Sequence, residues 1–127
     1  MVTRGKRVLV VDDEPTIVSL LTLALEAEGY QVEVAVNGRD ALDKVKQQAP
    51  DAILLDVMMP VLDGWHFLEE LRATPGTRQI PIIVLSAAYD AANHPALGSL
   101  VFLPKPFDVN MLLILLDDAL SNQETLA

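Results

Sequence analysis

The stretch LLDVMMP, residues 54–60, contains one charged residue inside an apolar run. Ala52–Leu55 consists only of apolar residues, which predicts a strand buried on both faces. Asp56 follows this strand directly, and Pro60 ends the apolar run. Burying a carboxylate costs free energy unless other groups compensate for the lost hydration. Asp56 is therefore a candidate functional residue, and other parts of the sequence must supply its partners.

Further apolar runs alternate with helical patterns on both sides of this stretch. The predicted strands are Arg7–Val11, Gln31–Val36, Ala52–Leu55, Ile82–Leu85 and Leu100–Leu103. The predicted helices are Pro15–Glu28, ended by Gly29, then Arg39–Gln48, Gly64–Ala73, and a last helix that Asp108 caps and that runs to about Leu120. This alternation predicts an α/β fold with a parallel sheet and helices on both of its faces.

The composition limits the class of protein. The 127 residues suit one domain, expected to span 1–127 with flexible ends at Met1–Gly5 and from about Ser121. The net charge of −9 argues against direct nucleic-acid binding, and no apolar run reaches the length of a membrane span. The absence of cysteine fits a cytoplasmic location.

Polar residues follow the predicted strands at one edge of the sheet. Asp12 and Asp13 end the first strand, and Asp56 ends the third. Ser86 ends the fourth strand, and Lys105 comes just after the fifth. Ligands in such sheets bind outside the carboxyl ends of the strands, so these side chains should converge. Three carboxylates would repel one another, and a hard divalent cation such as Mg²⁺ would remove that repulsion.

This set of side chains suits a phosphoryl group attached to a carboxylate. Asp56 is the best candidate nucleophile because it stands alone on the central strand, whereas Asp12 and Asp13 are better placed to hold a metal ion. Lys105 and Ser86 would contact the phosphoryl oxygens.

Five segments together resemble the receiver domain of two-component response regulators. They are VLVVDDEP, NGRDAL, PDAILLDVMMPVLDG, IPIIVLSA and LPKPF, in this order over nearly the whole chain. The resemblance implies a flavodoxin-like, doubly wound five-stranded sheet with strand order 2-1-3-4-5 and five helices. Asn93-His94-Pro95 falls where the fourth helix should run, so we expect that helix to be short or irregular.

The resemblance also implies the chemistry and the residues that perform it. Asp56 would accept a phosphoryl group from a histidine kinase, a phosphotransfer protein or acetyl phosphate, with Mg²⁺ as cofactor and Mn²⁺ as a substitute. The implied metal ligands are Asp12 (through water), Asp13, Asp56 and the backbone carbonyl of Met58. The implied switch residues are Ser86 and Phe102. The domain would catalyse only its own phosphorylation and dephosphorylation, and would not act as an enzyme on other substrates.

Three other interpretations are weaker. A haloacid-dehalogenase-type phosphatase needs a second aspartate two residues after the nucleophile, where Met58 stands. A flavodoxin-like binding module needs a phosphate-binding loop after the first strand, where Asp12 and Asp13 would repel phosphate. A receiver domain that serves only as a scaffold is a third alternative, although every expected site residue is present.

The last strand and the last helix predict a surface for a partner. Helical spacing assigns Leu112, Leu113, Leu116 and Leu120 to the core. The expected apolar face, which would bind a second copy or an output partner, consists of Leu100, Val101, Met111, Ile114 and Leu115. The plain alternative is that Leu100 and Val101 extend a buried strand and that Ile114 and Leu115 are isolated exposed residues.

Overall fold

The computed structural model describes residues 5–56, 64–74, 76–77, 80–86, 101–104 and 106–126. The strands are β1 (Arg7–Val11), β2 (Gln31–Ala35), β3 (Ala52–Asp56), β4 (Ile82–Ser86) and β5 (Val101–Pro104). The helices in these ranges are α1 (Pro15–Ala27), α2 (Gly38–Gln47), α3 (Gly64–Ala73) and α4 (Val109–Leu126). Each predicted strand is confirmed to within one residue at either end.

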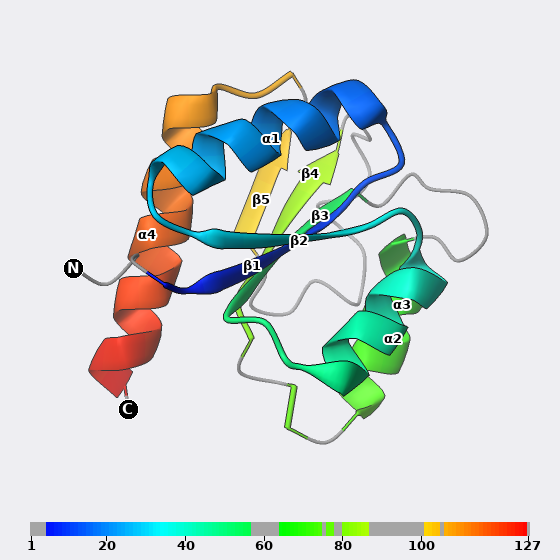
Figure 1. Ribbon diagram of the computed structural model, residues 1–127. Coiled ribbons are helices and arrows are strands. Elements are labelled where there is room, and N and C mark those ends of the chain that lie inside the picture. The colour runs from blue at the N-terminus through cyan, green and yellow to red at the C-terminus, as the bar shows by residue number, and fades with distance from the viewer. Residues whose placement is uncertain are drawn as a thin grey trace.

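The strands form one parallel sheet in the order β2-β1-β3-β4-β5, which confirms the predicted doubly wound topology. Helices α1 and α4 cover one face of this sheet, and α2 and α3 cover the other (Figure 1). The order reverses at β1, since the chain moves outward to β2 and then back across β1 to β3. In such sheets, this reversal creates the crevice where ligands bind.

The helix boundaries follow from local capping chemistry. The Asn37 side chain accepts a hydrogen bond of 2.8 Å from the Asp40 amide at the start of α2. Asp108 accepts one of 2.7 Å from the Asn110 amide at the start of α4, as predicted. Gly29 follows α1 with a φ of +94°, a left-handed conformation that glycine adopts without strain.

Two apolar clusters fill the space between the sheet and its helices. The cluster under α2 and α3 includes Leu9, Leu55 and Phe67. The cluster under α1 and α4 includes Leu21 and Leu54, together with the predicted core residues Leu112, Leu116 and Leu120; Leu113 packs against it partly buried. Nearly every residue of β1 and β3 is buried, which is the pattern expected of central strands covered on both faces.

Tyr30 is a polar exception in the second cluster. It is 4% exposed, and its hydroxyl has no hydrogen-bond partner among the described residues. Burial, together with the nearby Asp117 and Glu28 carboxylates, raises the pKa of Tyr30 to about 12. The sequence alone did not indicate this residue.

Several predictions about the last strand and helix were wrong. Helix α4 ends at Leu126, not near Leu120, because no glycine or proline follows Leu120 to stop it. Val101 and Leu115 do not lie on an exposed face; both are partly buried and pack against the core cluster. Met111 and Ile114 are exposed as predicted, at 47% and 62%.

Other predictions lie outside the described residues. The expected fourth helix falls between Ser86 and Val101, a segment that the structure does not describe. Leu100 lies in the same segment, and residues 1–4 are also outside the described ranges. Within the described ranges, no helix is both long enough and apolar enough to cross a membrane.

Candidate metal and phosphoryl site

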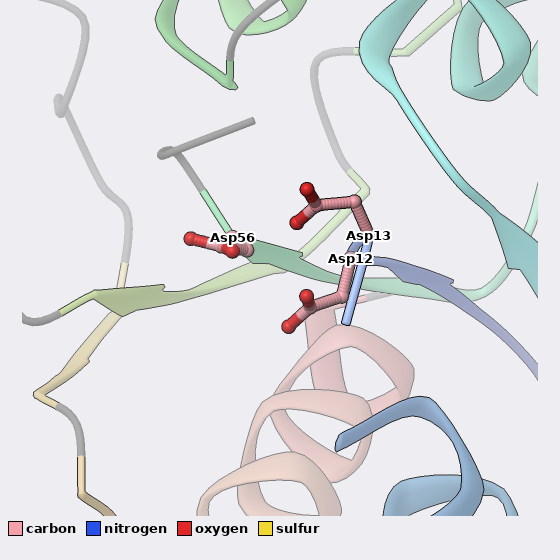
Figure 2. A group of neighbouring side chains, drawn as sticks. All are labelled: Asp12, Asp13 and Asp56. Atoms are coloured by element: carbon pink, nitrogen blue, oxygen red, sulfur yellow. The ribbon is translucent and has the colours of Figure 1, made fainter. Parts of the chain in front are cut away.

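Three carboxylates meet at the carboxyl ends of β1 and β3. Val11 of β1 lies level with Leu55 of β3, so Asp12 comes level with Asp56 on the neighbouring strand. Asp13 follows in the loop that leads into α1. One carboxylate oxygen from each of the three residues lies within 4.8 Å of the others, and Figure 2 shows the three side chains at these strand ends. The sequence prediction that Asp12, Asp13 and Asp56 converge is confirmed.

Two of these carboxylates are buried. Asp12 is 1% exposed and Asp56 is 4% exposed, whereas Asp13 is exposed to solvent. Water screens charges poorly at such positions, so the mutual repulsion of the buried pair is stronger than that of surface carboxylates. The arrangement therefore favours a bound cation, whose positive charge would reduce this repulsion.

The Glu14 backbone amide fixes the orientation of Asp12. It donates a hydrogen bond of 2.9 Å to Oδ1 of Asp12, and the Asp12 amide donates one of 3.1 Å to the Ala35 carbonyl in β2. Glu14 holds the N-cap position of α1, so neither Asp12 nor Asp13 is the N-cap residue of this helix. Aspartate side chains often bond to the amide two residues on, so this spacing was a readable signal that the sequence analysis missed.

The chemistry of the donor set fits a hard divalent cation. Carboxylate oxygens are the ligands that Mg²⁺ prefers, and Mg²⁺ sites in proteins usually combine one or two carboxylates with water molecules. An open, solvent-exposed side at Asp13 beside two buried carboxylates leaves access for such waters and for a ligand. The residues present therefore fit the metal that the sequence predicts.

The remaining predicted site residues are only partly described. Ser86 is the last residue of β4 and pairs with Pro104 of β5, which places its backbone at the same edge of the sheet as Asp56. Phe102 lies in β5 opposite Val84. The side chains of Ser86 and Phe102, and the whole of Met58 and Lys105, lie outside the described part of the chain.

Comparisons with known proteins agree with this geometry. The family model described as "Response regulator receiver domain" matches residues 8–117. Response regulator MprA of Mycolicibacterium vanbaalenii is 43% identical over 110 residues, which cover 84% of this chain and 47% of that protein. The chain thus spans about half the length of the curated relatives it matches.

Solved structures show the same fold. The chemotaxis response regulator CheY4 of Vibrio cholerae superposes with a TM-score of 0.84 at 33% identity, covering 91% of this chain and 98% of that one. The receiver domain of the sensor histidine kinase PA1611 from Pseudomonas aeruginosa superposes with a TM-score of 0.83 at 32% identity, covering 92% and 98%. That structure is described as having a magnesium ion coordinated in its active site cleft.

Proposed function

Because the chain belongs to the receiver-domain family of two-component response regulators, we propose that it is a switch operated by phosphorylation of Asp56. The family assignment carries the general function, which is signalling through phosphorylation. The observation that carries the residue assignment is the meeting of Asp12, Asp13 and Asp56 within 4.8 Å at the carboxyl edge of the sheet. The donor would be a histidine kinase, a phosphotransfer protein or acetyl phosphate.

Asp56 is the proposed nucleophile because of its position. It ends the central strand β3, is 4% exposed, and lies where the strand order reverses. Its carboxylate oxygen attacks phosphorus in line, forming an acyl phosphate while the bond from phosphorus to the donor's imidazole nitrogen or acetyl oxygen breaks. The leaving imidazole takes up a proton. Attack of water on the same phosphorus later releases inorganic phosphate and restores the carboxylate.

Asp12 and Asp13 are the proposed metal-binding residues. A bound Mg²⁺, or Mn²⁺ in its place, would neutralise charge on the carboxylates and on the phosphoryl oxygens. The Glu14 amide donates a hydrogen bond of 2.9 Å to Oδ1 of Asp12, which restrains the orientation of this carboxylate. The magnesium in the similar receiver domain of PA1611 supports the same assignment here, with the Met58 carbonyl as a further proposed ligand.

Ser86, Lys105 and Phe102 complete the proposed switch. Ser86 ends β4, which lies beside β3, and Lys105 follows β5, which lies beside β4, so both are proposed to contact a phosphoryl group on Asp56. Movement of Ser86 toward that group would let Phe102 turn inward, and the population would shift between two conformations. An output partner would read this change on the surface formed by β5 and α4.

Mass spectrometry of the intact protein after incubation with acetyl phosphate and Mg²⁺ tests the proposal. We expect one added phosphate on the parent, none on Asp56→Asn, and none when EDTA replaces the metal. Asp43→Asn is the matched control, because Asp43 is an exposed aspartate of α2 outside the cluster. It should be phosphorylated like the parent.

A scaffold that is never phosphorylated is the second candidate function. An unmodified parent in that experiment, with Mg²⁺ binding intact by calorimetry, would favour the scaffold. A phosphate that persists on Asp56→Asn would instead refute the assignment of the acceptor.

The proposed partner surface is smaller than the sequence predicted. Val101 and Leu115 pack against the core, so Met111 and Ile114 of α4 are the exposed members of the predicted face among the residues that the structure describes. We infer that a second copy or an output partner contacts the protein around these two side chains. Such a contact would bury apolar area and would be insensitive to salt.

A further inference from the structure

The edge strand β2 presents unused hydrogen-bonding groups on its outer side. The Gln31 amide donates to the Lys6 carbonyl, and the Asp12 amide donates to the Ala35 carbonyl. In a parallel pair, bonds to one neighbour come from alternate residues, so residues 31, 33 and 35 bond to β1. Val32 and Val34 therefore direct their backbone groups away from the sheet, where no strand of the described ranges follows β2. In Figure 1, β2 forms this margin of the sheet and leads into α2.

Helix α2 closes part of this margin. The Lys44 ammonium donates a hydrogen bond to the Val34 carbonyl and forms a salt bridge of 3.3 Å with Asp40. Asp40 in turn accepts a hydrogen bond of 3.3 Å from the amide of Val36, the residue just after β2. The two side chains thus occupy backbone groups at the carboxyl-terminal end of the outer edge.

We propose that the outer edge of β2 is a latent pairing surface for a second copy of this chain and that the Asp40–Lys44 pair keeps it closed. Two copies related by a twofold axis would align their β2 strands antiparallel. The outward backbone groups of β2 in one copy would then pair with the same groups in the other copy. An open edge of this kind is a template for strand pairing, and charged side chains at the edge are a common means of preventing it.

A second copy fits this surface better than an unrelated peptide. Glu33 is the charged residue of β2, and in a symmetric pair the Glu33 residues of the two copies would face each other. Arg7 of β1 forms a salt bridge of 2.6 Å with Glu33, which neutralises this charge. Val32 and Val34 are β-branched residues that favour strand pairing. With Lys44 removed, the Val34 carbonyl would need a new donor, and the matching strand of a second copy supplies backbone amides.

Sedimentation velocity of Lys44→Ala without any phosphoryl donor tests this proposal. We expect its dimerisation constant to be at least about tenfold tighter than that of the parent, since one backbone hydrogen bond is gained at each of two equivalent positions. Lys46→Ala is the matched control: it removes the same charge from an exposed position of the same helix turn. It should sediment like the parent. Hydrogen exchange should show new protection of the Val32 and Val34 amides in the Lys44→Ala dimer.

A second substitution separates strand pairing from other association. The Val34 amide points outward, a position where an edge strand tolerates proline, so Val34→Pro in the Lys44→Ala background should restore the parent's behaviour. Three results would each overturn the proposal. The first is that Lys44→Ala matches Lys46→Ala in sedimentation, and the second is that the double variant still dimerises. The third is that the parent itself already protects the Val34 amide in a dimer.

Discussion

Replacing Asp56 by asparagine should stabilise the protein when no divalent cation is bound. The substitution removes one of three negative charges whose oxygens lie within 4.8 Å of one another, and asparagine keeps a similar volume and an oxygen acceptor. Because Asp12 and Asp56 are both buried, their repulsion is poorly screened in the folded state and nearly absent in the unfolded chain. The free energy of unfolding should therefore rise.

The size of the effect follows from the separation. Two unit charges at 4.8 Å repel by about 3 kcal/mol at an effective dielectric constant of about 20. Solvent around the exposed Asp13 weakens the repulsion between Asp13 and Asp56. The free energy of unfolding of Asp56→Asn in EDTA is therefore expected to exceed that of the parent by about 1–3 kcal/mol. Mg²⁺ should reduce this difference in the free energy of unfolding between Asp56→Asn and the parent. At a Mg²⁺ concentration ten times the dissociation constant, binding stabilises the parent by about 1.4 kcal/mol, and the variant binds Mg²⁺ more weakly.

Urea unfolding at low ionic strength, in EDTA and then in Mg²⁺, measures both terms. Asp43→Asn serves as the control and should stay within about 0.5 kcal/mol of the parent in either buffer, because Asp43 lies outside the cluster. If Asp56→Asn is no more stable than the parent in EDTA, the three carboxylates do not repel one another as the geometry indicates. A gap that Mg²⁺ leaves unchanged would show that the cluster is not the cation site.

Four further outcomes are expected. Burial raises the pKa of Tyr30 from 10.0 to about 12, so the protonated phenol stabilises the fold below pH 10 and this contribution is lost as the pH rises toward 12. Tyr30→Phe should therefore gain about 1 kcal/mol relative to the parent between pH 8 and pH 11 in urea unfolding, and a constant difference would contradict the burial argument. The phosphorylated form should be long-lived, because Met58 and Ala88 cannot orient the attacking water; Met58→Asn with Ala88→Glu should speed loss of the phosphate measured by mass spectrometry. Equal decay rates would refute that role. Amide exchange over Tyr89–Ser99 should be faster than in α1, since Pro95 interrupts the expected helix, whereas strong protection there would show a regular helix. Association of the phosphorylated protein should persist in high salt and be lost in Ile114→Glu; dimers that salt disrupts and the substitution spares would point to ion pairs instead.

The sequence alone determined the order of the described elements and the three carboxylates that meet at the edge of the sheet. Strands such as Ala52–Leu55 were readable because a strand covered on both faces must be apolar throughout, and Asp108 was readable because capping depends on neighbouring residues. Asp12, Asp13 and Asp56 were also predictable, since parallel strands bring their carboxyl ends to one edge.

Only the tertiary structure decided which groups are buried and what they contact. Leu115 of α4 and Val101 of β5 are partly buried and pack against the core cluster, which helical spacing alone did not indicate for Leu115. The buried, unpartnered hydroxyl of Tyr30 depends on how α1 and α4 meet over β2, and the contact of Lys44 with the Val34 carbonyl depends on how α2 lies against the sheet margin. Local sequence patterns indicate which side of a helix or strand is apolar. Which residues that side contacts, and how deeply it is buried, depends on packing among residues far apart in the chain.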